Sequence, residues 1–379
     1  MSEERAQADR IPIAAPAVGP LERKRVRDVL ESGQLAAGEE VDAFEREFAA
    51  SCGVADAIAT ANGTAALHAA LAALGIGPGD TVLTTPFSFV ATANAIRLCG
   101  ATPVFADVDP RTLNLDPDRA EASARQQELD AILVVHLYGL PAAMERFGDI
   151  AERYDLALVE DAAQAHGAVI DGQPVGTFGD AGCFSFYPTK NMTTGEGGMI
   201  VTDSESVATR ARQFINHGRT DTYEHATLGH NFRMTDLAAA IGRVQLTRLP
   251  DFLEARSRHA ARLSEELAGT DLRTPPDPRD RRHVFHQYTV LTDDRAARQD
   301  ALERAGVDTG IYYPTPIHQQ PAYDGFDGSY PEAEAAAEQV LSLPVHPALA
   351  EDDLDRIVAA VRAGPSEGGE GAPGRSSTD

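Results

Sequence analysis

The chain contains 379 residues, of which 43% are hydrophobic, and its 58 acidic and 33 basic residues give a formal net charge of −25 at pH 7. This length allows two domains with substantial cores. The acid excess argues against nucleic acids and anionic membranes as partners, and no apolar run approaches the roughly 20 residues of a membrane span. Residues 1–10 lack the apolar core of a signal peptide, so we expect a cytoplasmic protein. Residues 1–10 and the Gly/Ser/Pro/Glu-rich residues 364–379 are expected to be disordered.

Lysine is nearly absent from this acidic sequence, because it occurs only as Lys24 and Lys190. We interpret the acid excess together with the loss of lysine as adaptation to high internal salt, with a generic acidic surface as the alternative. At about 1 M salt the Debye length is only about 3 Å, so the self-repulsion of an acidic chain is screened. The composition therefore favours a halophilic protein.

In the first half of the chain, helical and strand patterns alternate in the manner of α/β proteins. Continuous apolar runs at residues 131–136 and 157–160 have strand length, as expected for parallel strands covered on both faces. The helical pattern of residues 144–154 lies between them and completes a βαβ unit. The other elements expected here are helices at 20–32, 41–50, 65–74 and 88–98, and strands at 57–61, 81–85 and 102–106.

The character of the sequence changes at about Pro250, where a long charged helix is expected at residues 251–267 after a shorter one at 237–246. We therefore expect a large domain over residues 11–249 and a smaller C-terminal α+β domain over residues 250–363. The remaining expected elements are strands at 199–202 and 286–291 and helices at 207–216, 296–305 and 354–361.

Three histidines between residues 217 and 230 raise the question of a metal site. Their spacings of eight and five residues match no compact helical ligand pair, and no cysteine joins them. The three cysteines of the chain lie far apart and form no Cys-x-x-Cys pair, so we expect buried small hydrophobes without disulfide or zinc roles. No metal is therefore expected, and residues 217–236 are interpreted as a subunit or ligand contact.

The segment Asn62-Gly63-Thr64 lies between a short apolar strand and an Ala/Leu-rich helix. This arrangement places free backbone N–H groups and the Thr64 hydroxyl at a helix N-terminus, where an anion is stabilised. Taken alone, the segment also fits an ordinary N-cap, which is the more frequent feature.

Asp161 lies just past a buried strand, at the end of the strand where ligands bind in open α/β sheets. Gln164 follows three positions later and lies on the same side if the chain turns helically. The neighbouring Glu160 raises the alternative of two-carboxylate hydrolysis. Adjacent residues at the end of a strand point to opposite faces, so we do not expect these two carboxylates to share a site.

Lys190 lies in the segment from Phe184 to Gly198, where a short apolar strand leads into a Pro-containing turn that closes in glycines. A chain that has almost discarded lysine and keeps one here needs an amine that arginine cannot replace. Schiff-base chemistry is such a need, because a guanidinium stays protonated whereas an ammonium can lose its proton when it is desolvated.

One ligand would use the anion cradle at Gly63 and Thr64, the Asp161 carboxylate, the Lys190 amine and the Ser185 hydroxyl together. Pyridoxal 5′-phosphate carries an aldehyde, a basic ring nitrogen and a phosphate. Lys190 would bond to the aldehyde, Asp161 would pair with the pyridinium nitrogen, and the helix N-terminus with Ser185 would hold the phosphate. The sequence therefore predicts this cofactor.

Six segments occur in a recognisable order, namely NGTAAL at 62–67, FVATANAI at 89–96, EDAAQAHG at 160–167, the Lys190 segment, NFRMTD at 231–236 and LPVHP at 343–347. With them the chain, over roughly residues 11–363, resembles the fold-type I pyridoxal-phosphate aminotransferases of the DegT/DnrJ/StrS family, which make amino sugars on nucleotide carriers. The resemblance implies a large domain with a mixed, mostly parallel seven-stranded sheet between helices, followed by a smaller α+β domain. It also implies an active homodimer.

The resemblance implies further roles in cofactor binding. Phe89 matches the aromatic position that stacks on the cofactor ring, with Phe87 as the alternative. Gln164 matches a residue near the phenolic oxygen of the ring. Asn231 matches a residue that is donated across the dimer interface to the phosphate in the neighbouring active site.

The implied reaction is amino transfer in two halves, in which L-glutamate is the expected donor, a nucleotide-linked keto-sugar is the acceptor and Lys190 moves the Cα proton. Tyr312 and His318 fall where the small domain of the family approaches the sugar, with packing as the alternative for both. Sugar dehydratases of the family carry histidine at the lysine position, so Lys190 argues against that activity. Three more activities stay open at this point: a pyridoxal-phosphate-dependent lyase, an aminotransferase for a cyclitol ketone, and a sensor that binds the cofactor without amino transfer.

Overall fold

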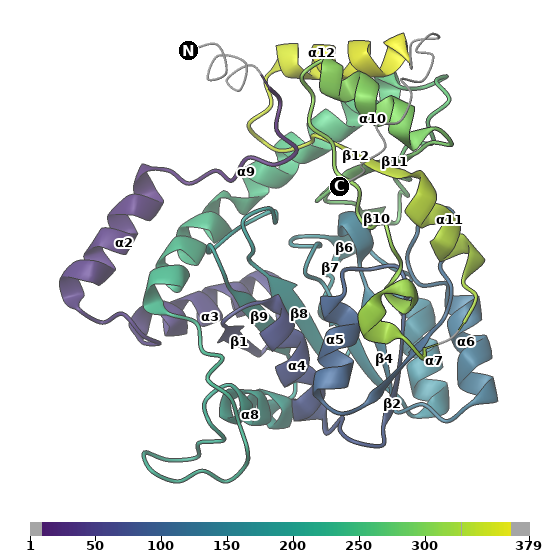
Figure 1. Ribbon diagram of the computed structural model, residues 1–379. Coiled ribbons are helices and arrows are strands. Elements are labelled where there is room, and N and C mark those ends of the chain that lie inside the picture. The colour runs from purple at the N-terminus through teal and green to yellow at the C-terminus, as the bar shows by residue number, and fades with distance from the viewer. Residues whose placement is uncertain (1–9, 327, 365–379) are drawn as a thin grey trace, which may run out of the picture.

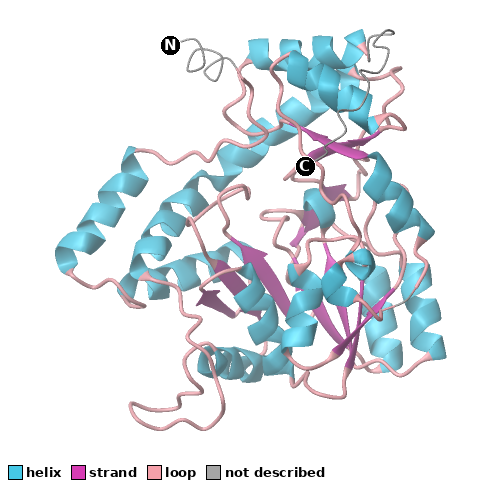
Figure 2. Cartoon of the chain, viewed as in Figure 1, coloured by secondary structure: helices cyan, strands magenta, loops and turns pink. Residues whose placement is uncertain are grey.

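A computed structural model of the chain describes residues 10–326 and 328–364. A central sheet lies between helices, and a smaller part with its own strands and helices lies at one end (Figure 1). Figure 2 shows the same arrangement by type of secondary structure. The predicted disordered ends lie outside the described residues, apart from residues 10 and 364. Among the described residues, no helix is long and apolar enough to cross a membrane.

The central sheet has seven strands, and only β9 runs against the others. β9 is antiparallel to both of its neighbours, and every other neighbouring pair is parallel. This mixed, mostly parallel sheet confirms the predicted fold class. In sheet order the strands are β1 (Asp56–Thr60), β9 (Gly198–Thr202), β8 (Ala181–Ser185), β5 (Ala157–Asp161), β4 (Ala131–Val135), β2 (Thr81–Thr84) and β3 (Thr102–Phe105).

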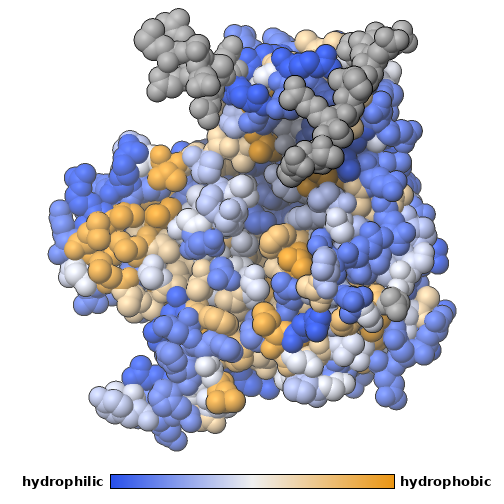
Figure 3. All heavy atoms as spheres, viewed as in Figure 1, coloured by the Kyte–Doolittle hydropathy of each residue, from blue (hydrophilic) through white to orange (hydrophobic). Residues whose placement is uncertain are grey.

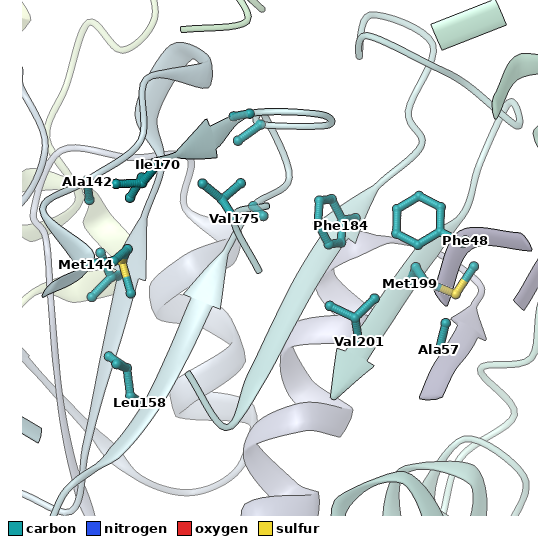
Figure 4. Close-up of a cluster of buried hydrophobic side chains, with 14 of the residues drawn as sticks. Phe48, Ala57, Ala142, Met144, Leu158, Ile170, Val175, Phe184, Met199 and Val201 are labelled. Atoms are coloured by element: carbon teal, nitrogen blue, oxygen red, sulfur yellow. The ribbon is translucent and has the colours of Figure 1, made fainter. Parts of the chain in front are cut away.

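Neighbouring residues of each strand enter two separate hydrophobic cores, one on each face of the sheet. Ile132 of β4 belongs to the first core and Leu133 to the second. Figure 4 shows part of the first core, where the Phe48 ring meets the Phe184 ring of β8 edge-on with centroids 5.1 Å apart. The helices are α3 (Glu39–Cys52), α6 (Pro117–Gln126), α7 (Met144–Tyr154) and α9 (Asp236–Glu266) on the first face, and α4 (Gly63–Leu74), α5 (Ala91–Leu98) and α8 (Glu205–Phe214) on the second.

Most of the elements that have a clear hydrophobic pattern form where they are predicted. The helices α2 (Pro20–Ser32) and α7 have the predicted bounds. The helix predicted at 88–98 begins later, at Ala91, so that Phe89 lies in the loop before α5. Short or charged elements were missing from the prediction because their patterns are weak. These are α6, α11 (Pro331–Gln339), β12 (Val340–Leu343), β6 (Val169–Ile170), β7 (Gln173–Pro174) and β10 (Arg281–Arg282).

The prediction of two helices around Pro250 is wrong, because one helix of 31 residues, α9, runs through the proline. A proline inside a helix costs about 3 kcal/mol, since it removes a backbone hydrogen bond. Leu249, Phe252 and Leu253 are buried beside it, and burial of each such side chain is worth about 1.5–3 kcal/mol. Packing therefore outweighs the local penalty. The domain boundary at residues 249 and 250 stays a prediction, and it would fall inside α9.

The smaller part of the molecule has its own hydrophobic core. Strands β11 (Tyr288–Leu291) and β12 pair in antiparallel register, and α10 (Arg295–Arg304) and α12 (Glu351–Ala363) contribute Leu302 and Ile357 to the same core. The second half of α9 adds Leu263, and Ile11 joins from the beginning of the described chain. α9 thus contributes to the first core of the sheet and to the core of the smaller part, and it connects the two.

Candidate active site

The loop after β8 folds back on the strand and holds Lys190 near the end of the sheet. The Thr193 hydroxyl donates to the carbonyl of Phe186 at 2.8 Å, and the Lys190 amide donates to the carbonyl of Tyr187 at 2.9 Å. Lys190 is half-buried, and burial of its amine lowers its pKa to about 8, although the negative charge of Asp161 opposes the shift. Near pH 8 a large fraction of this amine is uncharged and can act as a nucleophile.

Asp161 is the last residue of β5 and is buried. The Thr92 hydroxyl donates to its Oδ2 at 2.8 Å, and the Ala163 amide donates to its Oδ1 at 3.2 Å. Burial raises the pKa of Asp161, while these two hydrogen bonds and the charge of Lys190 act in the opposite direction. The site therefore contains a buried carboxylate and an amine that influence each other's protonation.

Glu160 faces a different part of the molecule from Asp161, as expected for adjacent strand residues. Its Oε1 accepts hydrogen bonds from the amides of Phe178 and Gly179 at 2.7 and 2.9 Å, and its Oε2 accepts from the Gly176 amide at 2.7 Å. Its Oε2 also lies 2.9 Å from Nε2 of His136. These contacts fix the end of β5, so Glu160 supports the position of Asp161 and does not form a two-carboxylate site with it.

The N-terminus of α4 and the end of β8 meet in a close backbone contact. A Cβ atom on Gly63 would lie 2.7 Å from Cβ of Ser185, so only glycine fits at this point. The Asn62 side chain caps α4 by accepting a hydrogen bond from the Ala65 amide at 2.9 Å. The Ser185 hydroxyl thus lies next to the first turn of α4, which contains Thr64. This is the arrangement that stabilises a phosphate group.

Gln164 is held by two hydrogen bonds, one of which involves a residue that the sequence did not point to. Its Oε1 accepts from the Tyr138 amide at 2.7 Å, and its Nε2 donates to the hydroxyl of Tyr313 at 3.0 Å. Phe89 is 55% exposed with its ring centroid 6.0 Å from that of Tyr313, whereas Phe87 is fully buried. Phe89 is therefore the phenylalanine that is free to face a ligand. Tyr313 joins the site from the far end of the sequence.

Tyr312 and His318 are not brought into this set of contacts. The carbonyl of Tyr312 accepts a hydrogen bond from the hydroxyl of Tyr138, whereas its neighbour Tyr313 points to Gln164. His318 lies with its Nε2 3.2 Å from Oε1 of Glu334. Substrate roles for Tyr312 and His318 stay predictions, and the contacts of His318 fit packing. An adjacent tyrosine pair was the only signal in the sequence for Tyr313.

Asn231 is exposed in the long loop between α8 and α9. It forms a β-bridge with Asn216, and the next residue, Phe232, accepts a hydrogen bond through its carbonyl from the Ala61 amide at 2.7 Å. Within one chain, no described hydrogen bond joins Asn231 to Lys190 or Asp161. Its predicted role toward a neighbouring active site stays a prediction.

A buried histidine near the lysine was also missed. His166 lies beside the rings of Phe184 and Phe186, with centroid distances of 5.4 and 5.6 Å. Burial and the charge of Lys190 lower its pKa to about 3, against the effect of the Ser185 backbone. This neutral ring adds no positive charge beside Lys190. It therefore helps to keep the surroundings of the amine apolar.

The residues present fit pyridoxal 5′-phosphate. The amine of Lys190 suits the aldehyde, the buried carboxylate of Asp161 suits the ring nitrogen, and the first turn of α4 beside Ser185 suits the phosphate. In residues 10–326 and 328–364, no group of three or more His, Cys, Asp or Glu side chains is placed to hold a metal ion.

Comparison with known proteins supports the same conclusion. A Geobacillus stearothermophilus protein named pleiotropic regulatory protein is 42% identical over 341 residues, which cover 88% of this chain and 91% of the relative. The UDP-N-acetyl-3-dehydro-alpha-D-glucosamine 3-aminotransferase of Acidithiobacillus ferrooxidans is 43% identical over 336 residues, which cover 88% and 91%. The structure of S. venezuelae DesV in complex with a ketimine intermediate matches with a TM-score of 0.88 and 39% identity, over 90% of this chain and 93% of that one.

The model of the DegT/DnrJ/EryC1/StrS aminotransferase family matches residues 16–362. This match spans the central sheet, the lysine loop and the smaller C-terminal part. It agrees with the resemblance found in the six sequence segments. The chain therefore belongs to the DegT/DnrJ/EryC1/StrS aminotransferase family.

Proposed function

We propose that this aminotransferase uses pyridoxal 5′-phosphate to move an amino group from L-glutamate to the keto group of a nucleotide-linked sugar. The observation that carries the proposal is the Lys190 amine, whose pKa is lowered to about 8, together with the buried carboxylate of Asp161 that acts on it. The Ser185 hydroxyl beside the first turn of α4 suits a phosphate and supports the choice of cofactor. The name of the Acidithiobacillus relative supports the substrate class, because that protein is a UDP-sugar 3-aminotransferase.

The residues of the site have separate tasks in this reaction, and Lys190 has two. When bound, the cofactor supplies an electron sink that stabilises the charge left on an amino acid when its Cα loses a proton. Lys190 would hold the aldehyde of the bound cofactor, and its free Nζ atom would accept the Cα proton of the amino donor. Asp161 keeps a negative charge at the ring nitrogen. Ser185 and the first turn of α4 hold the phosphate, and Phe89 covers one face of the ring.

A regulatory function is the main rival proposal, because the Geobacillus relative is named as a regulatory protein. A sensor would bind the cofactor and not react with L-glutamate. A pyridoxal-phosphate-dependent lyase would release ammonia or pyruvate from an amino acid. A cyclitol ketone in place of the keto-sugar would leave the first half of the reaction unchanged, and a panel of ketone acceptors distinguishes that case.

The first half of the reaction tests the proposed function directly. We expect L-glutamate to remove the visible absorbance of the lysine-bound cofactor and to release one 2-oxoglutarate per site. Lys190→Ala should slow this half-reaction at least about 10³-fold, because it removes both the covalent anchor and the proton carrier. The matched control is Lys24→Ala, which removes the other lysine of the chain, an exposed residue paired with Asp28. Persistence of the wild-type absorbance would leave the sensor as the better proposal.

We also infer that the active unit is a homodimer in which Asn231 reaches the phosphate of the neighbouring site. Large apolar side chains are exposed on α2 and beside it, and Figure 3 shows this apolar patch over α2. The loop that carries Asn231 exposes Tyr223 and Leu228 almost completely. Such surfaces are stabilised by contact with a second copy of the chain. The exposed residues on and near α2 are Val18, Leu21, Leu30 and Leu35.

Mixing two impaired variants tests this arrangement. Lys190→Ala lacks the anchor, and Asn231→Ala should bind the cofactor about tenfold more weakly because a hydrogen bond to a charged phosphate is lost. In a mixed dimer, one site receives both an intact Lys190 and an intact Asn231 from different chains. An equal mixture should therefore recover about a quarter of wild-type activity at limiting cofactor. If Asn231 serves its own chain, mixing restores nothing, and full activity of Asn231→Ala would exclude the role altogether.

The acidic composition supports adaptation to high salt as a further part of the proposal. The net charge of −25 destabilises a compact state through self-repulsion, which salt screens. We expect the midpoint of thermal unfolding to rise by several degrees between about 0.1 and 2 M KCl. KCl and NaCl at equal ionic strength should act alike, because screening depends on ionic strength. A midpoint that stays level across this range contradicts the adaptation.

A further inference from the structure

A chain of two buried hydroxyls leads to the carboxylate of Asp161. Ser88 lies in the loop before α5, and Thr92 is the second residue of that helix. The Oγ atom of Ser88 and the Oγ1 atom of Thr92 are 2.9 Å apart, and Thr92 Oγ1 lies 2.8 Å from Oδ2 of Asp161. Ser88, Thr92 and Asp161 are only 4%, 1% and 5% exposed. Bulk water therefore does not compete for these contacts.

The carboxylate of Asp161 determines which atom donates in each of these two hydrogen bonds. An ionised carboxylate only accepts hydrogen bonds, so the single hydroxyl proton of Thr92 points to Asp161. Thr92 must then accept from Ser88, which makes Ser88 the donor. Each oxygen of the Asp161 carboxylate thus has one donor from the protein: the Thr92 hydroxyl donates to Oδ2 and the Ala163 amide donates to Oδ1. Lone pairs remain on both oxygens for a ring nitrogen.

This use of a threonine differs from the ordinary one in helices and sheets. A buried threonine hydroxyl usually donates to a nearby backbone carbonyl. Thr84 of β2 does so, because its hydroxyl donates to the carbonyl of Leu133 at 2.8 Å. Thr92 instead donates its proton to the side-chain carboxylate of Asp161. A structural role in α5 alone does not require this contact.

The hydrogen bond from Thr92 also opposes the effect of burial on the pKa of Asp161. Burial favours the protonated carboxyl, and the hydrogen bond from Thr92 favours the ionised form. The titratable groups that face Asp161 from the neighbouring elements are Lys190 in the loop after β8, Cys183 in β8, His136 after β4 and Tyr313 from the C-terminal part. Of these, Lys190 and His136 favour the ionised form, whereas Cys183 and Tyr313 are neutral groups that add no positive charge.

We propose that Thr92 is a positioning residue for the proposed amino transfer. Its hydroxyl holds Asp161 ionised and oriented toward the cofactor's ring nitrogen. Ser88 fixes the direction of the Thr92 hydroxyl. A charged Asp161 keeps the ring nitrogen protonated, and this protonation makes the ring an effective electron sink. A protonated Asp161 would instead leave the nitrogen neutral. Thr92 thus acts through Asp161 and touches no reacting atom.

Thr92→Val tests the inference, because it removes the hydroxyl and keeps the shape of the side chain. Two readouts on the reconstituted enzyme are used: the ¹⁵N chemical shift of labelled cofactor, which reports protonation of the ring nitrogen, and the rate of the half-reaction with L-glutamate. In Thr92→Val the ring nitrogen should lose its proton at a lower pH than in the wild type. The half-reaction should slow by about ten- to a hundredfold, the effect of one hydrogen bond to a charged group.

Two further variants separate this role from packing. Thr92→Ser keeps the hydroxyl and should restore the wild-type shift and a rate within about threefold of it. Thr84→Val removes an equally buried hydroxyl that bonds only a carbonyl, so it should lower the unfolding midpoint without moving the ¹⁵N shift. A wild-type shift and rate in Thr92→Val would overturn the inference, as would equal losses in Thr84→Val.

The experiment also separates failure of this inference from failure of the proposed function. If the wild-type protein does not react with L-glutamate, the proposed function fails, but the ¹⁵N shift still reports whether Thr92 controls the charge at the ring nitrogen. If Thr92→Val does not fold, Ser88→Ala replaces it, and an unchanged shift in Ser88→Ala overturns the role of the chain of hydroxyls. A partial move of the shift in Ser88→Ala supports it.

Discussion

The rest of the site depends on one electrostatic constraint. The amine of Lys190 is partly shielded from water, and a buried carboxylate, Asp161, acts on it. Burial lowers the pKa of the amine to about 8, and Asp161 limits the shift. The same burial would tend to protonate Asp161, so the protein supplies hydrogen bonds from Thr92 and the Ala163 amide that favour its charge. Neighbouring groups such as His166 stay neutral and leave the balance undisturbed. The reactivity of Lys190 therefore depends on several residues that lie together at this end of the sheet.

The fold creates this constraint by bringing separate segments to one edge of a mostly parallel sheet. The end of β5 supplies Asp161, and Glu160 fixes that end through contacts on the opposite side. The N-terminus of α4 packs so closely against Ser185 that the first residue of the helix must be a glycine, Gly63. The C-terminal part adds Tyr313, and α9 runs without a break from the first core of the sheet to the core of the smaller part. The aldehyde, ring nitrogen and phosphate of the proposed cofactor would thus meet matching groups from distant parts of the chain.

The sequence predicted the elements and residues whose chemistry is local, and it missed those that depend on tertiary packing. Lys190, Asp161 and Gly63 could be found because a rare lysine, a strand end and a helix N-terminus leave signals within a few residues. The continuous helix through Pro250 could not, since burial of Leu249, Phe252 and Leu253 against the large core decides it. Tyr313 could not be distinguished from Tyr312 because only the path of the chain decides which ring faces Gln164. Thr92 lies inside a predicted segment, but its partner is far away in the sequence.

Cofactor loading as a function of pH tests the central constraint most directly. An amine must be uncharged to attack the aldehyde of pyridoxal 5′-phosphate, so the rate at which the cofactor-free protein captures it follows the neutral fraction of Lys190. With Lys24→Ala as the background, we predict a midpoint near pH 8, in place of the ordinary lysine value of 10.5. Asp161→Asn removes the negative charge that stabilises the ammonium and should move the midpoint below that of the parent. A midpoint near the ordinary lysine value, or no response to Asp161→Asn, would contradict the account.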